Sequence, residues 1–290
     1  MPGLIHWMDD FPLRIAIPFA FWLFCCGACI GSFLNVVVYR LPLGKNLSRP
    51  PSSCPACDQR IRWYDNIPIV SWLCLKARCR NCKEPIAIRY LLVEGVVASS
   101  FVLLGIAEPI TAGSVLPGDY EIQDVTIWMI FLTHLAMLTT LLGAGLIWRD
   151  HGRIPARLFS TLLVILVVAQ FVAPDFYPQL ASEGSGRGIT LLAGLATGLL
   201  AGGVLFLLER LLCGKSSTSV IASLALVGIV LGWQLTTLTM VLVTVCYLLL
   251  QLAAGRRRPL PVLLFTTAVI LLLIVRWQWS LDLLSAVFPT

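Results

Sequence analysis

The sequence predicts an all-α polytopic membrane protein with about eight transmembrane helices and a small cytoplasmic loop domain stapled by zinc. Three observations carry this prediction. Of the 290 residues, 58% are hydrophobic and 12% are charged, apolar runs of spanning length recur along the chain, and two CxxC pairs share one basic segment. An ordinary soluble domain has roughly 25% charged residues. A soluble fold of this composition would expose large apolar patches, which excludes a soluble enzyme, a disordered chain and a secreted disulfide scaffold.

Eight apolar runs are the candidate transmembrane helices, because a spanning helix needs about 20 mainly apolar residues. The runs cover residues 15–38, 90–107, 125–147, 157–173, 189–208, 217–232, 234–253 and 259–276. The runs at 157–173 and 217–232 are the shortest.

Positively charged residues predict how these helices are oriented. With the N-terminus outside, the inner segments are 39–89, 148–157, 209–216 and 254–258, and they hold 18 of the 21 Lys and Arg residues. The outer segments hold nine of the 15 acidic residues. Because this sorting follows the positive-inside rule, we interpret segment 39–89 as a cytoplasmic loop. Membrane lipid is therefore a predicted partner, touched by the arginines at 256–258, and nucleic acid is not.

Four of the ten cysteines form two CxxC pairs in the basic loop. Cys54 and Cys57 come first, and Cys79 and Cys82 follow after 21 residues. A cytoplasmic loop is reducing, which favours a metal over disulfides. Paired CxxC knuckles are typical of structural zinc, and four protein ligands leave no open position for catalysis. We predict one zinc ion that folds the loop, with free or redox-active thiols as the alternative.

Small residues recur at four-residue spacing in several runs, which lets helix backbones approach closely. We predict that they pack helices within one chain, and a dimerisation face is the alternative. The residues are Gly27 and Gly31 in the first run, Gly194, Gly198 and Gly202 in the fifth, and Gly228 and Gly232 in the sixth.

A series of motifs at the end of the first run and through the loop carries a family resemblance. The motifs are Gly31–Pro42 (GSFLNVVVYRLP), Pro51–Cys57 (PSSCPAC), Asn66–Leu73 (NIPIVSWL), Arg78–Cys82 (RCRNC) and Arg89–Glu94 (RYLLVE). Residues 27–97 resemble the N-terminal domain of the bacterial prepilin leader peptidases. The resemblance implies a domain over 1–97, with the first transmembrane helix and the loop 39–89. The remainder, 98–290, would be a bundle similar to a degenerate aspartic peptidase core.

The resemblance also implies an activity, a location and partners. Members of this family are bifunctional enzymes of type IV pilus and type II secretion systems in the bacterial cytoplasmic membrane. They cut the short basic leader from prepilins and pseudopilins, and they methylate the new N-terminus with S-adenosylmethionine. Two aspartates carry the proteolysis, because one carboxylate activates water while its protonated partner polarises the scissile carbonyl.

This sequence departs from the family at the first aspartate. In the family that residue lies seven positions before a proline, at the cytosolic end of the third span. The proline here is Pro155, and seven positions before it stands Trp148. Asp150 comes two positions later, where many members carry a second, non-catalytic acid. Ala156 stands where Asp or Asn is usual in the family.

The second aspartate of the family belongs to a GxGD motif at the start of the sixth span. The corresponding stretch here is Leu212–Val220 (LCGKSSTSV), and no Asp or Glu occurs between Lys215 and Pro259. A serine or threonine does not replace an ionisable carboxylate. Both catalytic carboxylates are therefore predicted to be lost.

Two other acids, Asp150 and Glu209, are weak candidates for a relocated catalytic pair, since both are predicted to face the cytoplasm. The plainer interpretation pairs Asp150 with flanking arginines and Glu209 with Arg210 or Lys215. No residue is predicted with confidence to be catalytic or to bind a cofactor other than zinc.

The leading functional hypothesis is a non-proteolytic member of the family that binds prepilin or pseudopilin N-termini, assists an active peptidase paralogue, or methylates. The second is an active leader peptidase or methyltransferase that uses unrecognised residues such as Asp150 and Glu209. A membrane scaffold unrelated to pilins is a more distant third.

Overall fold

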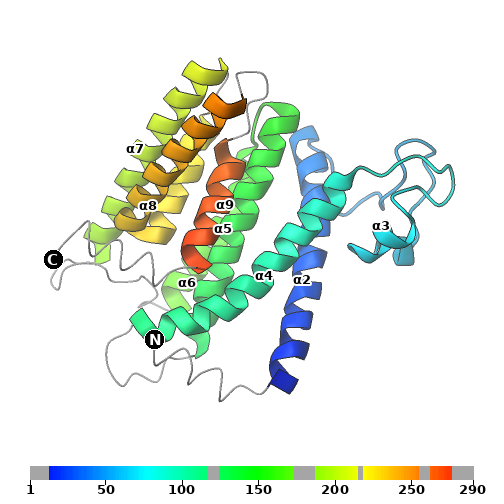
Figure 1. Ribbon diagram of the computed structural model, residues 1–290, viewed down its shortest axis with the longest axis horizontal. Helices are drawn as coiled ribbons and strands as arrows, with labels where there is room; N and C mark the ends of the chain where they lie inside the picture. Colours follow the sequence, from blue (N-terminus) through cyan, green and yellow to red (C-terminus); the bar gives the residue numbers. More distant parts are fainter. Residues whose placement is uncertain (1–12, 116–123, 173–186, 215–217, 255–261, 276–290) are drawn as a thin grey trace. The chain divides into compact units, whose positions relative to one another are not determined.

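A computed structural model describes residues 13–115, 124–172, 187–214, 218–254 and 262–275 (Figure 1). Over these residues the regular secondary structure is helical, and the loop adds two isolated β-bridges, Ser53 with Arg60 and Arg78 with Pro85, among turns and irregular segments. The chain divides into two compact units, residues 1–106 and 107–290. The domain boundary at 97 that the resemblance implies stays a prediction.

The first unit consists of two long helices and the loop between them. Helix α2 spans Leu13–Arg40, and helix α4 spans Ile88–Val115 and continues into the second unit. The glycines of α2 lie against α4: a Cβ on Gly27 would meet Ala98 and Phe101, and one on Gly31 would meet Glu94. The predicted role of these two glycines in packing within the chain is therefore confirmed.

Short elements shape the loop. The 3₁₀ helix η1 (Leu41–Leu43) follows α2 and ends at Gly44, which has a φ of 65° and donates its N–H to Leu41 O over 3.1 Å. The 3₁₀ helix η2 spans Trp63–Asn66, and the short helix α3 spans Val70–Cys74. Glycine tolerates the left-handed conformation that this turn requires, so the first helix stops at the predicted end of the first run.

The second unit holds the remaining helices. These are α5 (Asp124–His151), the 3₁₀ helix η3 (Ala156–Phe159), α6 (Ser160–Val172), α7 (Arg187–Cys213), α8 (Ser219–Ala254) and α9 (Val262–Val275). Helix α5 ends because Gly152 adopts a φ of 69° and donates its N–H to Trp148 O over 2.9 Å. Pro155 then begins η3 in an extended conformation. This turn fixes the end of α5 where Trp148 lies.

Helices α7 and α8 form the most extensive helix pair of this unit and lie side by side in Figure 1. A Cβ on Gly194 would meet the carbonyl of Gly228, and one on Gly198 would meet the carbonyl of Leu224. The stripe of small residues thus packs helices of one chain, as predicted. Gly232 breaks α8 with a φ of 73° and a ψ of 172°, between the predicted runs 217–232 and 234–253.

The helices agree in position with the eight predicted runs. Four helices are long and apolar enough to cross a membrane: Ala16–Leu43, Ile88–Ala107, Trp128–His151 and Leu191–Leu211. The other four runs correspond to shorter apolar helices: Ala156–Ala169, Ser219–Gly232, Gln234–Leu249 and Val262–Val275. The count of eight spans and the orientation stay predictions. The N-terminal residues 1–12, Lys215 and the arginines at 256–258 lie outside the described residues.

Candidate functional sites: a four-cysteine centre and a buried carboxylate

The four predicted ligands, Cys54, Cys57, Cys79 and Cys82, come together in the loop. All four Sγ atoms lie within 4.8 Å of one another, and the Sγ atoms of Cys54 and Cys82 are 3.7 Å apart. Zinc binds thiolate sulfur at about 2.3 Å in a tetrahedron, which places two sulfurs about 3.8 Å apart. The cluster is therefore compatible with a single zinc ion.

Two equivalent turns hold the four cysteines. In the first, Cys54 N–H donates to Gln59 O over 3.0 Å and Asp58 N–H donates to Cys54 O over 2.9 Å. In the second, the corresponding bonds run from Cys79 N–H to Glu84 O (2.8 Å) and from Lys83 N–H to Cys79 O (3.1 Å). Asp58 and Lys83 both adopt positive φ, 54° and 62°. Each turn thus points both of its thiols to one side.

Hydrogen bonds from N–H groups lower the pKa of two of the four thiols and so favour their thiolate form. The N–H of Gln59 and then the side-chain amide of Asn81, 3.6 Å from the sulfur, lower the pKa of Cys57. The backbone N–H groups of Cys82 and Asn81 lower the pKa of Cys79 to about 7. Hydrogen bonds to the charged form of a group favour that form.

The fourth thiol shows what a bound cation would change in the cluster. The N–H of Glu84 lowers the pKa of Cys82, but burial and the three neighbouring thiols outweigh it and raise the pKa to about 12. Four thiolates cannot share so small a volume without a positive charge between them. A divalent ion removes this conflict, because thiolates coordinate it directly.

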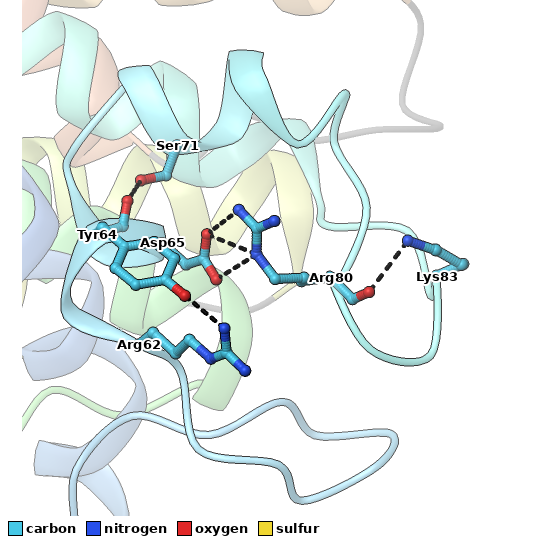
Figure 2. A network of polar contacts seen from close by, with 6 residues as sticks. All are labelled: Arg62, Tyr64, Asp65, Ser71, Arg80 and Lys83. Carbon is cyan, nitrogen blue, oxygen red and sulfur yellow. Dashed lines mark hydrogen bonds and ion pairs between the residues drawn. The ribbon is translucent and has the colours of Figure 1, made fainter.

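An ion pair connects the second turn to the segment between the turns (Figure 2). Arg80 lies within the second CxxC pair, and its guanidinium donates to both oxygens of Asp65 over 2.7–3.1 Å. The side chain of Asp65 is 8% exposed, and Arg80 holds its pKa below the ordinary value. Arg80 also lies over the ring of Tyr64, whose hydroxyl accepts a hydrogen bond from Arg62. These contacts join the second cysteine turn to the segment Arg62–Asp65.

In the second unit a buried carboxylate occupies the region where the resemblance would place catalysis. Glu209, near the end of α7, is 4% exposed. It accepts hydrogen bonds from the side chain of Trp148 on α5 and from the backbone N–H of Val262, the first residue of α9. Its Oε2 has no hydrogen-bond partner among the described residues. Glu209 therefore ties the ends of three helices together and satisfies an N–H that the start of a helix leaves open.

Asp150, the other candidate acid, lies on a different side of α5 from Trp148. Asp150 follows Trp148 by two residues on α5 and is exposed. Two helical positions are about 200° apart around the axis, so a side chain at 150 points away from the side that Trp148 presents to Glu209. The expected pairing of Glu209 with Arg210 is not what the described residues show, because its partners are Trp148 and Val262. Lys215 lies outside them.

Several residues of these sites carried no signal in the sequence. Asn81 and Arg80 lie inside the CxxC spacing, but nothing in the sequence shows that they reach Cys57 and Asp65. The sequence singled out Trp148 only because it stands where the family has its first aspartate. Its bond to Glu209 joins two helices, and the sequence did not predict it. The buried Glu94 of α4, which accepts the N–H of Ile69 over 2.7 Å, was also not anticipated.

The fold and the cysteine site define a class, a multi-pass helical membrane protein with a four-cysteine loop, and known proteins identify the family. The sequence pattern of the bacterial peptidase A24 N-terminal domain matches residues 25–107. The prepilin leader peptidase/N-methyltransferase of Stutzerimonas stutzeri is 30% identical over 248 residues, which cover 76% of this chain and 75% of that protein. The chain belongs to the prepilin leader peptidase/N-methyltransferase family.

Other relatives match over shorter stretches of the chain. The prepilin leader peptidase/N-methyltransferase of Myxococcus xanthus (strain DK1622) is 57% identical over 76 residues, which cover 26% of this chain and 23% of that protein. That of Klebsiella pneumoniae is 42% identical over 104 residues, covering 34% of this chain and 46% of that protein. These matches thus span less than half the length of the two relatives. No solved structure matches the chain.

Proposed function

We propose that this chain is a non-proteolytic member of its family in the bacterial cytoplasmic membrane, and that it binds prepilin or pseudopilin N-termini without cutting them. The observation that carries the proposal is the hydrogen bond between the side chain of Trp148 and Glu209. It joins an indole, at the position of the family's first aspartate, to the buried carboxylate of Glu209.

The chemistry of peptide hydrolysis supports this proposal. An aspartic peptidase needs two carboxylates that share a water, one as base and the other as acid. An indole has no proton-accepting group, and Glu209 already accepts hydrogen bonds from Trp148 and Val262. The stretch from Lys215 to Pro259 supplies no second acid. Neither half of the catalytic pair is then filled.

The second candidate is an active leader peptidase that uses Glu209 with Asp150. One observation favours it, namely that Oε2 of the buried Glu209 has no partner among the described residues. The rotation of about 200° between positions 148 and 150 of a helix argues against it, because a pair that shares one water must face one point. The non-proteolytic function is therefore the better supported of the two proposals.

We further propose that the four cysteines bind structural zinc. Cys54, Cys57, Cys79 and Cys82 would hold the ion, and the ion would neutralise the thiolates and fix the loop. The hydrogen-bonded turns and the mutual distances of the sulfurs support this assignment. All four positions of a tetrahedral ion would be filled by the chain, so the ion has no role in hydrolysis.

For topology we propose eight spans, an external N-terminus and a cytoplasmic four-cysteine loop. The distribution of Lys and Arg supports this orientation. Reporter fusions after residues 60, 153 and 257 are then cytoplasmic, and fusions after 118 and 182 are external. A cytoplasmic signal at 118 would contradict the eight-span arrangement.

Co-expression with a prepilin in cells that lack other leader peptidases tests the function. Mass spectrometry of the prepilin N-terminus reads leader removal and methylation separately, because methyl transfer from S-adenosylmethionine rests on the resemblance alone. We expect the leader to remain intact. Supplying an active peptidase paralogue in the same cells then shows whether this chain alters cleavage or methylation by the paralogue. Leader removal by this chain alone would contradict the proposal.

A further inference from the structure

A hydrogen bond joins the loop to α4 at Glu94, six residues after the start of that helix. The carboxylate of Glu94 accepts the N–H of Ile69 over 2.7 Å, and Ile69 directly precedes α3. Glu94 lies six positions after Ile88, the first residue of a stretch that is long and apolar enough to span a membrane. At 1.5 Å per residue this is about 9 Å along the helix axis. The loop therefore folds back beside the first turns of a membrane span.

The backbone at this point is held in an unfavourable conformation. Ile69 has a φ of 63° and a ψ of −56°, and a β-branched residue at positive φ is a genuine outlier. Such a conformation persists only where its surroundings hold it. The carboxylate of Glu94, which is 7% exposed, accepts the N–H of Ile69 at this point. The position of α3 beside α4 is thus a constrained feature of the fold.

Helix α3 has an anchored side and an open side. On the anchored side, Ser71 Oγ donates to Tyr64 O over 3.0 Å (Figure 2), and Trp72 Nε1 donates to Ile86 O over 3.2 Å. On the open side lie Val70 and Leu73, three positions apart, which are 52% and 57% exposed. Residues three apart share one face of a helix.

The segment before α3 adds more exposed apolar surface. Trp63 is 81% exposed and Ile67 is 41% exposed. Trp63 packs edge-on against Tyr64 at a centroid distance of 5.6 Å. Four large apolar side chains, Trp63, Ile67, Val70 and Leu73, are therefore exposed within eleven consecutive residues, and Tyr64 beside them is 38% exposed.

The charge around this segment is positive. Arg60, Arg62, Lys76 and Arg78 flank it and are all exposed. The acid within it, Asp65, is bound to Arg80. Exposed tryptophan and aliphatic side chains, flanked by arginine and lysine, are the composition that anionic membrane interfaces attract.

We propose that α3 and the segment Trp63–Ile67 form an interfacial anchor, which inserts the open side of α3 into the leaflet from which α4 emerges. The occupant of this surface is anionic phospholipid. Val70, Leu73 and Trp63 enter the region between headgroups and acyl chains, and the flanking arginines and lysine contact the headgroups. The anchor holds the four-cysteine loop flat on the membrane instead of letting it extend into solvent.

A photo-crosslinking amino acid placed at Leu73 tests this anchor in the full chain. The protein is reconstituted into nanodiscs of phosphatidylethanolamine and phosphatidylglycerol and illuminated, and adducts are identified by mass spectrometry. The matched control carries the probe at Gln59, which is exposed in the first cysteine turn. Equal metal content in both variants shows that the loop is folded.

We expect lipid adducts at position 73 in several-fold excess over position 59. We also expect the yield at 73 to fall when phosphatidylcholine replaces phosphatidylglycerol. Adducts at 73 to residues 107–290 of the same chain, or to another protein, would overturn the proposal, as would equal lipid yields at the two positions. An unchanged yield in phosphatidylcholine would overturn its assignment to anionic lipid.

Discussion

The cysteine loop and the buried Glu209 are both polar clusters built from segments far apart in the sequence, and they differ in what their polar groups are aimed at. In the loop, four sulfurs converge on one point within 4.8 Å of one another. At Glu209, the carboxylate accepts hydrogen bonds from the Trp148 side chain and from the Val262 backbone. A polar cluster can bind an outside atom only when its coordinating or hydrogen-bonding atoms still point at the place that atom would occupy. The loop meets this condition, whereas the Glu209 carboxylate already accepts hydrogen bonds from Trp148 and Val262 and keeps Oε2 without a partner among the described residues.

The two regions also differ in what stabilises them. The loop has few buried side chains and depends on the cysteine turns and the Asp65–Arg80 pair. The bundle depends on helices in backbone contact, as at Gly198 and Leu224. Metal removal should therefore damage the first region and spare the second, while a packing change should do the opposite.

Loss of a cysteine ligand is the largest expected effect. Cys57→Ser and Cys82→Ser should each reduce bound zinc from about one ion per chain to a small fraction, because a structural site needs all four thiolates. The loop should become sensitive to protease while the bundle stays folded. Metal analysis and limited proteolysis of the full chain measure this. Cys74→Ser, an exposed cysteine outside the cluster, is the control, and an equal loss of zinc in that variant would contradict the ligand assignment.

Acidification should weaken zinc binding steeply. The pKa of Cys82 is about 12 in the metal-free loop, so this thiol is protonated at pH 7 and must release its proton on binding. The pKa of Cys79 is about 7, so below pH 7 a second proton must be released. As the pH is lowered toward 7, the affinity for zinc should fall at least about tenfold per pH unit. Below pH 7 it should fall about a hundredfold for each further unit. Competition with a chelator measures the slope. An affinity independent of pH would show that thiolates are not the ligands.

A side chain at the α7–α8 contact should destabilise the bundle alone. Gly198→Ala places a Cβ against the Leu224 carbonyl and the Ala225 backbone, and overpacking typically costs about 1–3 kcal/mol. In Gly203→Ala the new Cβ meets nothing within 4 Å. Both variants gain the same helix propensity, so their difference isolates the clash. Denaturant unfolding in micelles compares them, and zinc content should be unchanged in both. Equal stabilities would contradict the close packing.

A destabilisation of similar size is expected at Trp148. Trp148→Phe removes the indole donor and leaves buried Glu209 one partner short, which should lower the free energy of unfolding of the bundle by about 1–3 kcal/mol. Trp128→Phe, on the same helix at an exposed position, is the matched control. If both substitutions cost the same, the Trp148–Glu209 bond contributes nothing, and the account of this region is wrong.

The sequence predicted the local features of both regions. The CxxC spacing predicted the cysteine cluster, because each pair lies within a single turn. The break at Gly232 and the shortness of α6 followed from the lengths of the apolar runs. The glycine spacing predicted close approach of helix backbones within the chain, because only glycine and other small residues allow such contact.

The contacts between distant segments could not be predicted in this way. The bond between Trp148 and Glu209 depends on how α5 and α7 are rotated toward each other, and nearly uniform apolarity around these helices leaves no pattern that fixes the rotation. The Glu94–Ile69 bond depends on a strained backbone that no local preference indicates. Asp65 and Arg80 are ordinary loop charges until the two cysteine turns bring them together.

The most direct measurement of the central claim is a time course of leader removal. The purified full chain and the Stutzerimonas stutzeri relative are reconstituted in identical vesicles with one prepilin substrate, and N-termini are read by mass spectrometry. We predict that the relative removes the leader and that this chain leaves it intact over the whole course. Robust cleavage by this chain that Glu209→Gln or Asp150→Asn abolishes would contradict the claim and show that the catalytic acids have moved.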